Sequence, residues 1–189
     1  MKTWILALML LNPLERLDWT VARAVQEERR PALEPVMAAA SSWARPPIVS
    51  MGLAVVLAAD VASGGGWSTV RLAAVSLAGT NLVVESLKRI VGRERPDGER
   101  RRSNSSFPSS HAANAFAIAW LLRSRWRRAG IAAFAPALLV SFSRMYLNRH
   151  FLSDVLAGAL IGCVMTWLIS RWLPARARVE PSPAARRSV

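Results

Sequence analysis

The sequence predicts an all-α protein, an integral membrane helical bundle with about five transmembrane helices and additional interfacial helices at the N-terminus. Two features support this prediction. Hydrophobic residues make up 52% of the 189 residues, yet the chain also carries 25 Lys and Arg against 12 Asp and Glu. A bilayer span needs about 20 mostly apolar residues, so apolar stretches separated by strongly basic loops indicate a chain that crosses a membrane several times.

Five apolar stretches approach the length of a bilayer span. They are residues 47–62, 67–87, 109–123, 129–143 and 151–173. The third and fourth are short, and each alone would also suit a buried helix of a soluble protein. Five such stretches in series, joined by short loops, favour the membrane interpretation and define residues 47–173 as one transmembrane domain.

The two ends of the chain differ from this domain. Residues 1–46 have apolar and charged faces and are expected to form interfacial helices. Residues 4–11 resemble a signal-peptide core, but the charged residues that follow give the wrong spacing for cleavage. The tail, residues 174–189, is rich in Pro, Ala and Arg and is expected to be disordered.

Charge and cysteine content narrow the possible partners. The formal net charge of +13 suits anionic lipid headgroups or phosphate-bearing substrates. Nucleic acid is not expected, because the basic residues lie between membrane-length segments and not along one soluble face. The single cysteine, Cys163, excludes an intrachain disulfide and a multi-cysteine metal site. Nothing in the sequence indicates an oligomeric state.

The two histidines of the chain, His111 and His150, precede or open the third and fifth spans. Two crossings separate the loop 88–108 from the loop 144–150, so both loops should emerge on the same face of the membrane. Histidine is the side chain best suited to proton transfer and nucleophilic attack near neutral pH. The pair is therefore a candidate catalytic site at one membrane surface.

Basic side chains converge on the same face. Lys88 and Arg95 are seven residues apart, and Arg144 enters from the other loop. Three such cations could hold a phosphoryl group and stabilise its transition-state charge. They could also be ordinary interfacial cations that bind lipid headgroups. That simpler interpretation is preferred for the other basic residues of the first loop, which are Arg89, Arg93, Arg100, Arg101 and Arg102.

Small polar residues and one acid complete the candidate site. Ser109 or Ser110 can cap the third helix, whose free amide hydrogens form an anion site, although capping alone would also explain both serines. Asp154 lies four residues after His150, on the same helix face. Its carboxylate could hydrogen-bond one ring nitrogen of His150 and leave the other free to attack. An acid is also favourable in the first helical turn without any catalytic role.

Three sequence blocks in this region resemble the type 2 phosphatidic acid phosphatase family, which includes soluble bacterial acid phosphatases and vanadium haloperoxidases. The family pattern is Lys, six residues and Arg-Pro, then Pro-Ser-Gly-His, then Ser-Arg, five residues, His, three residues and Asp. The matching residues are Lys88, Arg95, Pro96, Pro108, Ser109, Ser110, His111, Ser143, Arg144, His150 and Asp154. Ser110 replaces the usual Gly. It can still supply an amide hydrogen, so we expect it to tune the site.

The resemblance implies a lipid phosphatase with a phosphohistidine intermediate. In these roles His150 is the nucleophile, Asp154 orients it and His111 protonates the leaving oxygen. Lys88, Arg95, Ser109, Ser110 and Arg144 are expected to bind the phosphoryl group, with no metal and no cofactor. The substrate is expected to be a lipid phosphate or diphosphate, with polyprenyl phosphate or diphosphate ahead of phosphatidic acid.

Two rival interpretations remain at the level of sequence. A haloperoxidase with bound vanadate would use the same residues, but membrane spans disfavour it. A non-catalytic membrane protein that binds anionic lipids through basic loops explains the charge but not the histidines and Asp154. We expect a multi-pass protein of the inner membrane. Basic residues flank both faces, so the charge count is ambiguous. Bacterial relatives in the resembled family favour a site on the outer, periplasmic face.

Overall fold

The computed structural model describes residues 12–42, 67–99 and 105–173, together with four isolated positions between the first two ranges. Every secondary-structure element in this part of the chain is helical, which confirms the all-α prediction. In chain order the elements are α2 (Pro13–Glu27), the 3₁₀ helix η1 (Pro31–Leu33), α3 (Glu34–Ser42), α5 (Ser68–Val91), α6 (Ser110–Arg125), α7 (Arg127–Ala132), α8 (Phe134–Tyr146) and α9 (Leu152–Trp172).

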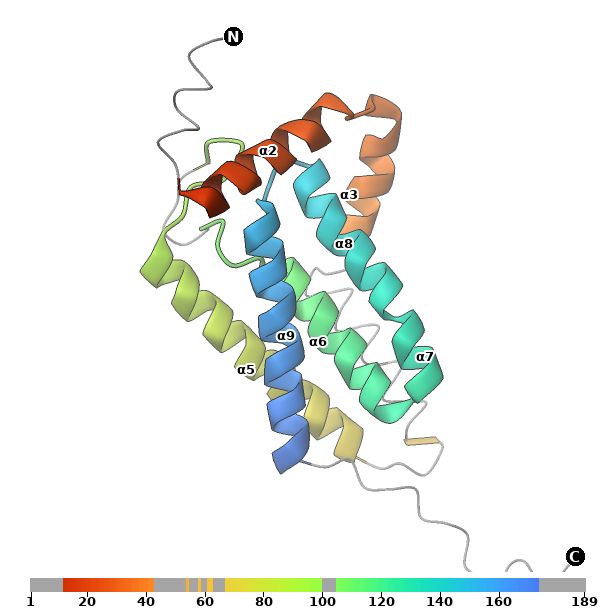
Figure 1. Cartoon of the computed structure of the whole chain (residues 1–189). Helices are drawn as coiled ribbons and strands as arrows, with labels where there is room; N and C mark the ends of the chain where they lie inside the picture. The colour runs from red at the N-terminus through yellow and green to blue at the C-terminus, as the bar shows by residue number, and fades with distance from the viewer. Residues whose placement is uncertain are drawn as a thin grey trace, which may run out of the picture.

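The longer helices pack side by side as a bundle, with α9 in contact with both α5 and α6 (Figure 1). The closest packing is between α6 and α9. Gly158 and Gly162 of α9 face the backbone of α6, and a Cβ atom at Gly162 would collide with the Ala113 carbonyl oxygen. Small residues at such contacts allow helix backbones to approach closely, as in membrane bundles. This contact fixes the start of α9 against the start of α6.

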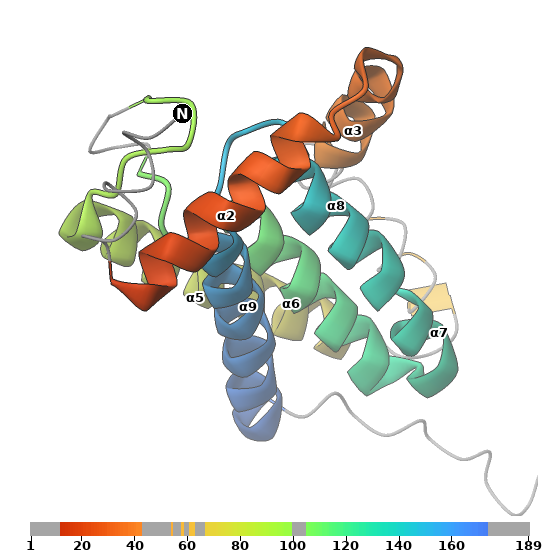
Figure 2. The ribbon, with the colours of Figure 1, turned by 45° about the horizontal axis from the view of Figure 1, so that its top comes forward.

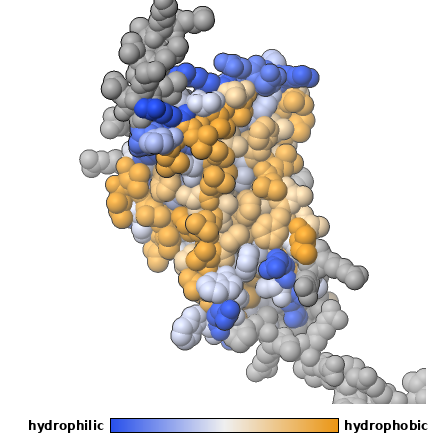
Figure 3. Space-filling model, viewed as in Figure 1, coloured by the Kyte–Doolittle hydropathy of each residue, from blue (hydrophilic) through white to orange (hydrophobic). Residues whose placement is uncertain are grey.

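Length and surface composition agree with a membrane setting. The 24 residues of α5 and the 21 residues of α9 are long and apolar enough to cross a bilayer. At 1.5 Å per residue they extend roughly 36 and 31 Å, against a hydrocarbon core of about 30 Å. Leu82 of α5 and Leu160 of α9 are 71% and 65% exposed. Figure 3 shows a broad apolar band between two hydrophilic ends.

The predicted spans match the observed helices with shifted boundaries. The span 67–87 continues in α5 to Val91, where Gly92 adopts a left-handed conformation (φ 58°) and ends the helix. The span 129–143 is divided, because α7 ends at Ala132 and α8 begins at Phe134 with Pro136 in its first turn. The spans 109–123 and 151–173 correspond to α6 and α9. The predicted span 47–62 falls almost wholly outside the described residues.

The N-terminal helices are docked on one end of the bundle. Figure 2 shows α2 lying across the ends of α8 and α9, with α3 beside α8. The Tyr146 hydroxyl of α8 donates to the Arg30 carbonyl at 2.8 Å and accepts from the Arg30 amide at 2.8 Å. The Gln26 side chain also donates to the carbonyls of Met145 and Tyr146. These bonds place the N-terminal segment where the loops before α6 and α9 meet.

Candidate active site

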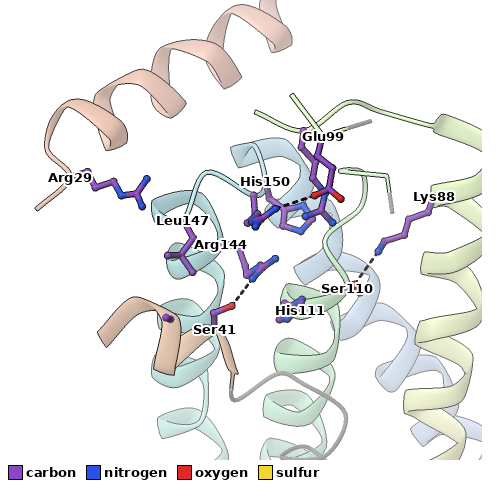
Figure 4. A pocket seen from close by; sticks show the side chains of 12 residues that line it. Arg29, Ser41, Lys88, Glu99, Ser110, His111, Arg144, Leu147 and His150 are labelled. Carbon is purple, nitrogen blue, oxygen red and sulfur yellow. Dashed lines mark hydrogen bonds and ion pairs between the residues drawn. The ribbon is translucent and has the colours of Figure 1, made fainter. Parts of the chain in front are cut away.

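A cavity of about 560 Å³ opens at the end of the bundle that carries α2 and α3. It collects side chains from both halves of the chain (Figure 4). The lining residues are Arg29, Ala38, Ser41, Lys88, Arg95, Glu99, Ser110, His111, Arg144, Leu147, Arg149 and His150. Of the eight site residues predicted from sequence, six line this cavity, and Ser109 and Asp154 lie behind its wall.

Lys88 reaches the cavity from the last turn of α5. The side chain is buried, and its ammonium group donates to the Ser110 hydroxyl at 3.2 Å. A second partner is Glu85, one turn earlier on α5, at 3.6 Å. Lys88 is therefore a buried cation held between α5 and the first residue of α6.

Arg95 lies in the loop that follows α5. The Gly98 amide donates to the Arg95 carbonyl at 3.0 Å, and the Arg95 amide donates to the Glu99 carbonyl at 3.2 Å. Gly98 has φ 82°, which this tight turn requires and glycine adopts readily. Burial lowers the pKa of Arg95, against the opposing effect of Glu99, but a guanidinium stays charged in proteins. The turn thus holds a fixed cation in the cavity wall.

The two predicted serines have different positions at the N-terminus of α6. Ser109 is fully buried, and its hydroxyl accepts the Ala112 amide hydrogen at 3.4 Å as the helix cap. Ser110 and His111, the first two residues of α6, both line the cavity. The structure therefore gives Ser109 a capping position and leaves Ser110 and His111 beside the space where a phosphoryl group could bind.

Arg144 lies in the last turn of α8 and points toward the centre of the cavity (Figure 4). Its guanidinium donates to the hydroxyl of Ser41, in α3, at 2.6 Å. The loop after α8 then reverses, with Asn148 at φ 57° and the Arg149 amide bound to the Arg144 carbonyl at 2.9 Å. This reversal brings His150 to the cavity beside Arg144.

His150 is 2% exposed and is held by one ring nitrogen. Its Nδ1 lies 2.8 Å from the Ser106 carbonyl oxygen. A carbonyl can only accept, so Nδ1 carries the proton and Nε2 keeps its lone pair. The Asp154 carboxylate, which the sequence suggested as the hydrogen-bond partner, lies 3.8 Å from Nδ1. At this distance it acts on the ring through its charge, and the direct hydrogen bond goes to the Ser106 backbone.

The surroundings keep His150 neutral. Burial lowers the pKa of His150 to about 4, and the positive charges of Arg144 and Arg95 act in the same direction. The neighbouring Asp154 opposes this shift but does not cancel it. A neutral imidazole with Nδ1 protonated presents an unprotonated nitrogen, which is the form needed for nucleophilic attack.

Asp154 is fully buried and holds the elements behind His150 together. One carboxylate oxygen accepts from the Ser106 hydroxyl at 2.5 Å and from the Phe151 amide at 2.8 Å. The other oxygen accepts from Arg93 at 2.8 Å. Asp154 therefore links the start of α9 to both loops that form the site.

The expectation that Arg93 is an ordinary headgroup-binding cation is wrong. Its guanidinium bridges the carboxylates of Asp154 and Asp18, at 2.8 and 2.7 Å, and lies over the Phe151 ring at 4.4 Å. Burial alone would lower the pKa of Arg93, but the bonds and charges of Asp18 and Asp154 raise it. The sequence offered one signal: Asp18 lies three, four and seven residues before Val21, Ala22 and Val25, on the apolar side of an amphipathic helix.

The chain is similar to known proteins along most of its length. The sequence profile of the PAP2 superfamily matches residues 69–178. Phosphatidylglycerophosphatase B of Bacillus subtilis is 30% identical over 177 residues, which cover 84% of each protein. The crystal structure of a transmembrane PAP2 type phosphatidylglycerolphosphate phosphatase from Bacillus subtilis is similar with a TM-score of 0.76 and 25% identity, covering 94% of this chain and 96% of that chain.

A more local similarity links the chain to lipid A 1-phosphatase of Porphyromonas gingivalis. The two are 39% identical over 89 residues, which is 44% of this chain and 19% of that relative. The present chain thus spans only a fraction of the length of this larger protein. The PAP2 profile match covers more than half of the chain and includes all the predicted site residues. The similarity to phosphatidylglycerophosphatase B extends along most of the chain. The chain belongs to the PAP2 superfamily.

Proposed function

We propose that this protein is a membrane lipid phosphatase that hydrolyses a phosphomonoester or diphosphate through a phosphohistidine at His150. The observation that carries the proposal is the environment of His150. Its Nδ1 is bound to a backbone carbonyl, and its ring lines a cavity with five basic residues, of which Lys88 and Arg95 are buried. An unprotonated ring nitrogen next to an anion-binding cavity is suited to attack on phosphorus.

The proposed reaction has two steps. Nε2 of His150 attacks phosphorus while the bond from phosphorus to the lipid oxygen breaks, and His111 gives a proton to that oxygen. Water then attacks the phosphohistidine, with His111 accepting a proton from the water, and inorganic phosphate leaves. Lys88, Arg95 and Arg144 stabilise the phosphoryl oxygens in both transition states, assisted by the free amides at the start of α6.

The charges around the cavity support catalysis without a metal. Among the described residues that line it, five are basic and one, Glu99, is acidic. A divalent cation prefers several oxygen ligands, whereas this lining repels cations and attracts phosphate. We therefore expect activity to persist in excess chelator, and vanadate to inhibit by adopting the trigonal-bipyramidal geometry of the transition state. Loss of activity in EDTA with recovery on adding magnesium would contradict this part of the proposal.

The same charges favour a substrate with two anionic groups. Lys88, Arg95 and Arg144 suffice for one phosphoryl group. Arg29 and Arg149 add two further cations to the lining; Arg29 pairs with Glu34, and Arg149 pairs with Asp97 and Glu99, so a second anionic group would compete with these carboxylates. Phosphatidylglycerol phosphate and a polyprenyl diphosphate both carry a second phosphate near the first, whereas phosphatidic acid does not. Phosphatidylglycerol phosphate is the first candidate because the related phosphatidylglycerophosphatase is similar along most of the chain. Polyprenyl diphosphate is the second.

A substrate panel tests this proposal. The full chain, purified in lipid nanodiscs, is given phosphatidylglycerol phosphate, a polyprenyl diphosphate and phosphatidic acid, and phosphate release is measured. The first two should be hydrolysed faster than the third, and His150→Ala should be inactive on all three. Absence of phosphate release from every substrate, with retained binding to anionic vesicles, would instead support a lipid-binding protein without catalysis.

We also propose that the cavity faces the outside of the inner membrane. This orientation places the turn between α6 and α7 in the cytoplasm, with Arg123 and Arg125 just before it and Arg127 and Arg128 just after it. Basic residues also flank the cavity end, so the positive-inside rule does not decide between the two orientations, and the proposal rests on the resemblance to bacterial family members that act on the outer face. Cysteines introduced at the exposed positions Glu94, near the cavity, and Ser124, at the opposite end, report the orientation in a Cys163→Ser background. An impermeant thiol reagent should label position 94 in intact spheroplasts. Labelling of position 124 alone would reverse the assignment.

A further inference from the structure

An acidic residue of the N-terminal helix lies buried behind the candidate nucleophile. Asp18 is 1% exposed and is the single buried residue of α2, whose 15 residues are otherwise exposed or half-buried. An amphipathic helix normally buries apolar side chains. Burial of a carboxylate is costly unless it is paired and hydrogen-bonded, so the contacts of Asp18 indicate why α2 docks where it does.

Three hydrogen bonds hold Asp18, and they come from two segments distant in sequence. One carboxylate oxygen accepts from the Ser153 amide at 2.8 Å. The other accepts from the Ser153 hydroxyl at 2.5 Å and from the Arg93 guanidinium at 2.7 Å. Asp18 thus binds the first turn of α9 and the loop after α5 at the same time.

Arg93 connects Asp18 to Asp154. While one nitrogen binds Asp18, the other donates to the Ser153 hydroxyl at 2.7 Å and to Asp154 at 2.8 Å. A planar guanidinium with both of its terminal nitrogens hydrogen-bonded has little freedom to rotate. The ring of Phe151 lies against Arg93, and Trp19 of α2 packs edge-on to that ring at 5.0 Å. The position of α2 therefore determines where Arg93 holds Asp154.

Asp154 is in turn connected to the nucleophile through Ser106. Asp154 accepts the Ser106 hydroxyl, and the carbonyl of the same residue holds Nδ1 of His150. A path of hydrogen bonds, joined at Ser106 through that residue's own covalent structure, thus runs from α2 to the imidazole.

The charge of this network suits the reaction. Asp18, Arg93 and Asp154 together carry two negative charges and one positive charge. When Nε2 of a ring that keeps its Nδ1 proton bonds to phosphorus, the ring becomes cationic. The net negative charge behind the ring then stabilises the phosphorylated state, whereas the cations of the cavity stabilise the phosphoryl oxygens.

We propose that Asp18 is a positioning residue for His150, acting through Arg93 and Asp154, so that docking of the N-terminal helix α2 makes the nucleophile competent for phosphorylation. This inference rests on the proposed phosphohistidine mechanism. It differs from a purely anchoring role for Asp18, which would affect the amount of folded protein but not the rate at which folded protein forms the phosphoenzyme.

The test compares Asp18→Asn with Glu27→Gln, which removes the same charge from an exposed position of the same helix. In nanodiscs, Asp18→Asn should slow single-turnover formation of the acid-labile phosphoenzyme and lower kcat by about 10–100-fold, by analogy with the outer hydrogen-bond partners of metal-binding histidines. KM should change little, because Asp18 does not line the cavity. Glu27→Gln should behave like the wild type.

Arg93→Gln and the double variant show whether Asp18 acts through Arg93. If it does, Asp18→Asn should slow phosphorylation only slightly further in the Arg93→Gln background, because residues of one network are not additive. Fully additive losses would overturn the proposal. If Asp18→Asn does not fold, Asp18→Glu keeps the charge and displaces the carboxylate. Slower phosphorylation with unchanged KM in that variant supports the proposal.

His150→Ala separates failure of this inference from failure of the proposed function. Activity in His150→Ala would contradict the phosphohistidine mechanism itself. An inactive His150→Ala together with wild-type phosphorylation in Asp18→Asn, or in Asp18→Glu if that variant is used, would overturn only the role of Asp18.

Discussion

The two sides of His150 differ in composition and in origin. The side that faces the cavity is lined by cations, among them Lys88, Arg95 and Arg144. The side that faces away from the cavity contains the carboxylates of Asp154 and Asp18, joined by Arg93. Under the proposed mechanism, one side binds the phosphoryl group, and the other holds and balances the ring when it becomes positive.

The two sides therefore have different proposed roles: the cavity side binds the substrate, and the side behind the ring positions His150. The cations of the cavity belong to short sequence blocks whose spacing is visible along the chain. The network behind the ring joins α2, the loop after α5 and the start of α9, across separations of up to 135 residues. Changes on the cavity side should therefore depend on which substrate is bound, and changes behind the ring should affect every substrate alike.

Among changes behind the ring, the largest effect is expected for Asp154→Asn. Loss of the carboxylate charge weakens the hold on Ser106 and removes the charge that balances the phosphorylated ring. By analogy with orienting carboxylates elsewhere, kcat should fall on the order of 10²–10⁴-fold. The fall should be similar for a lipid monophosphate, a lipid diphosphate and an aryl phosphate. A loss confined to one of these substrates would show that Asp154 contributes to leaving-group chemistry.

His111→Ala should give the opposite pattern. General acid catalysis typically contributes 10²–10⁴-fold, and less as the leaving group becomes less basic. The loss should be largest for phosphatidic acid, whose leaving group is an alkoxide, and smaller for a diphosphate or an aryl phosphate. Initial rates on the three substrates measure this pattern. Equal losses on all three would show that His111 is not the proton donor.

A smaller effect is expected at the close contact between α6 and α9. Gly162→Ala would place a methyl group against the Ala113 carbonyl, so α9 and α6 must separate. Overpacking of this kind costs about 1–3 kcal/mol and should lower thermal stability together with kcat. Gly79→Ala is the matched control, because its Cβ would meet only the flexible side-chain ends of Ile169 and Met165, at 3.2 Å. Equal stability of the two variants would contradict the proposed close contact.

The last prediction concerns pH, with an effect that is absent near neutral pH. His150 has a pKa lowered from 6.5 to about 4 in the folded protein. Between these values the unfolded chain binds a proton that the folded protein does not, so stability falls as the pH decreases through this window. The loss from this residue reaches about 3 kcal/mol near pH 4. Thermal unfolding of wild type and His150→Gln from pH 7 to pH 4 should show a shallower decline in the variant. Parallel curves would indicate that His150 titrates normally.

The helices and the cavity were predictable because their signals are local. Apolar length marks α5 and α9, and the spacing of Lys88, Arg95, His111, Arg144 and His150 marks the cavity. The division between α7 and α8 was missed because apolar content continues across it, although Pro136 gave a local indication. A helix break of this kind depends on backbone geometry more than on hydrophobicity.

The positioning network was not predictable in the same way. Arg93 and its exposed neighbour Arg89 are both arginines near the end of α5, and the local sequence does not show which of them is bound by other residues. The contacts of Arg93 depend on Asp18 of α2, 75 residues away along the chain. The partner of His150 Nδ1 is a backbone carbonyl, which any residue at position 106 would supply. Two of its members left a trace in the sequence: Asp154, by its spacing of four residues from His150, and Asp18, as an acid on an apolar helix face.

Direct detection of the covalent intermediate tests the central proposal. Enzyme in nanodiscs is mixed with ³²P-labelled phosphatidylglycerol phosphate or polyprenyl diphosphate, quenched in alkali within one turnover and digested, and the labelled peptide is identified by mass spectrometry. Acid-labile phosphate on His150, absent in His150→Ala, is the expected result. Catalytic turnover with no labelled protein, or with label on another residue, would contradict the mechanism.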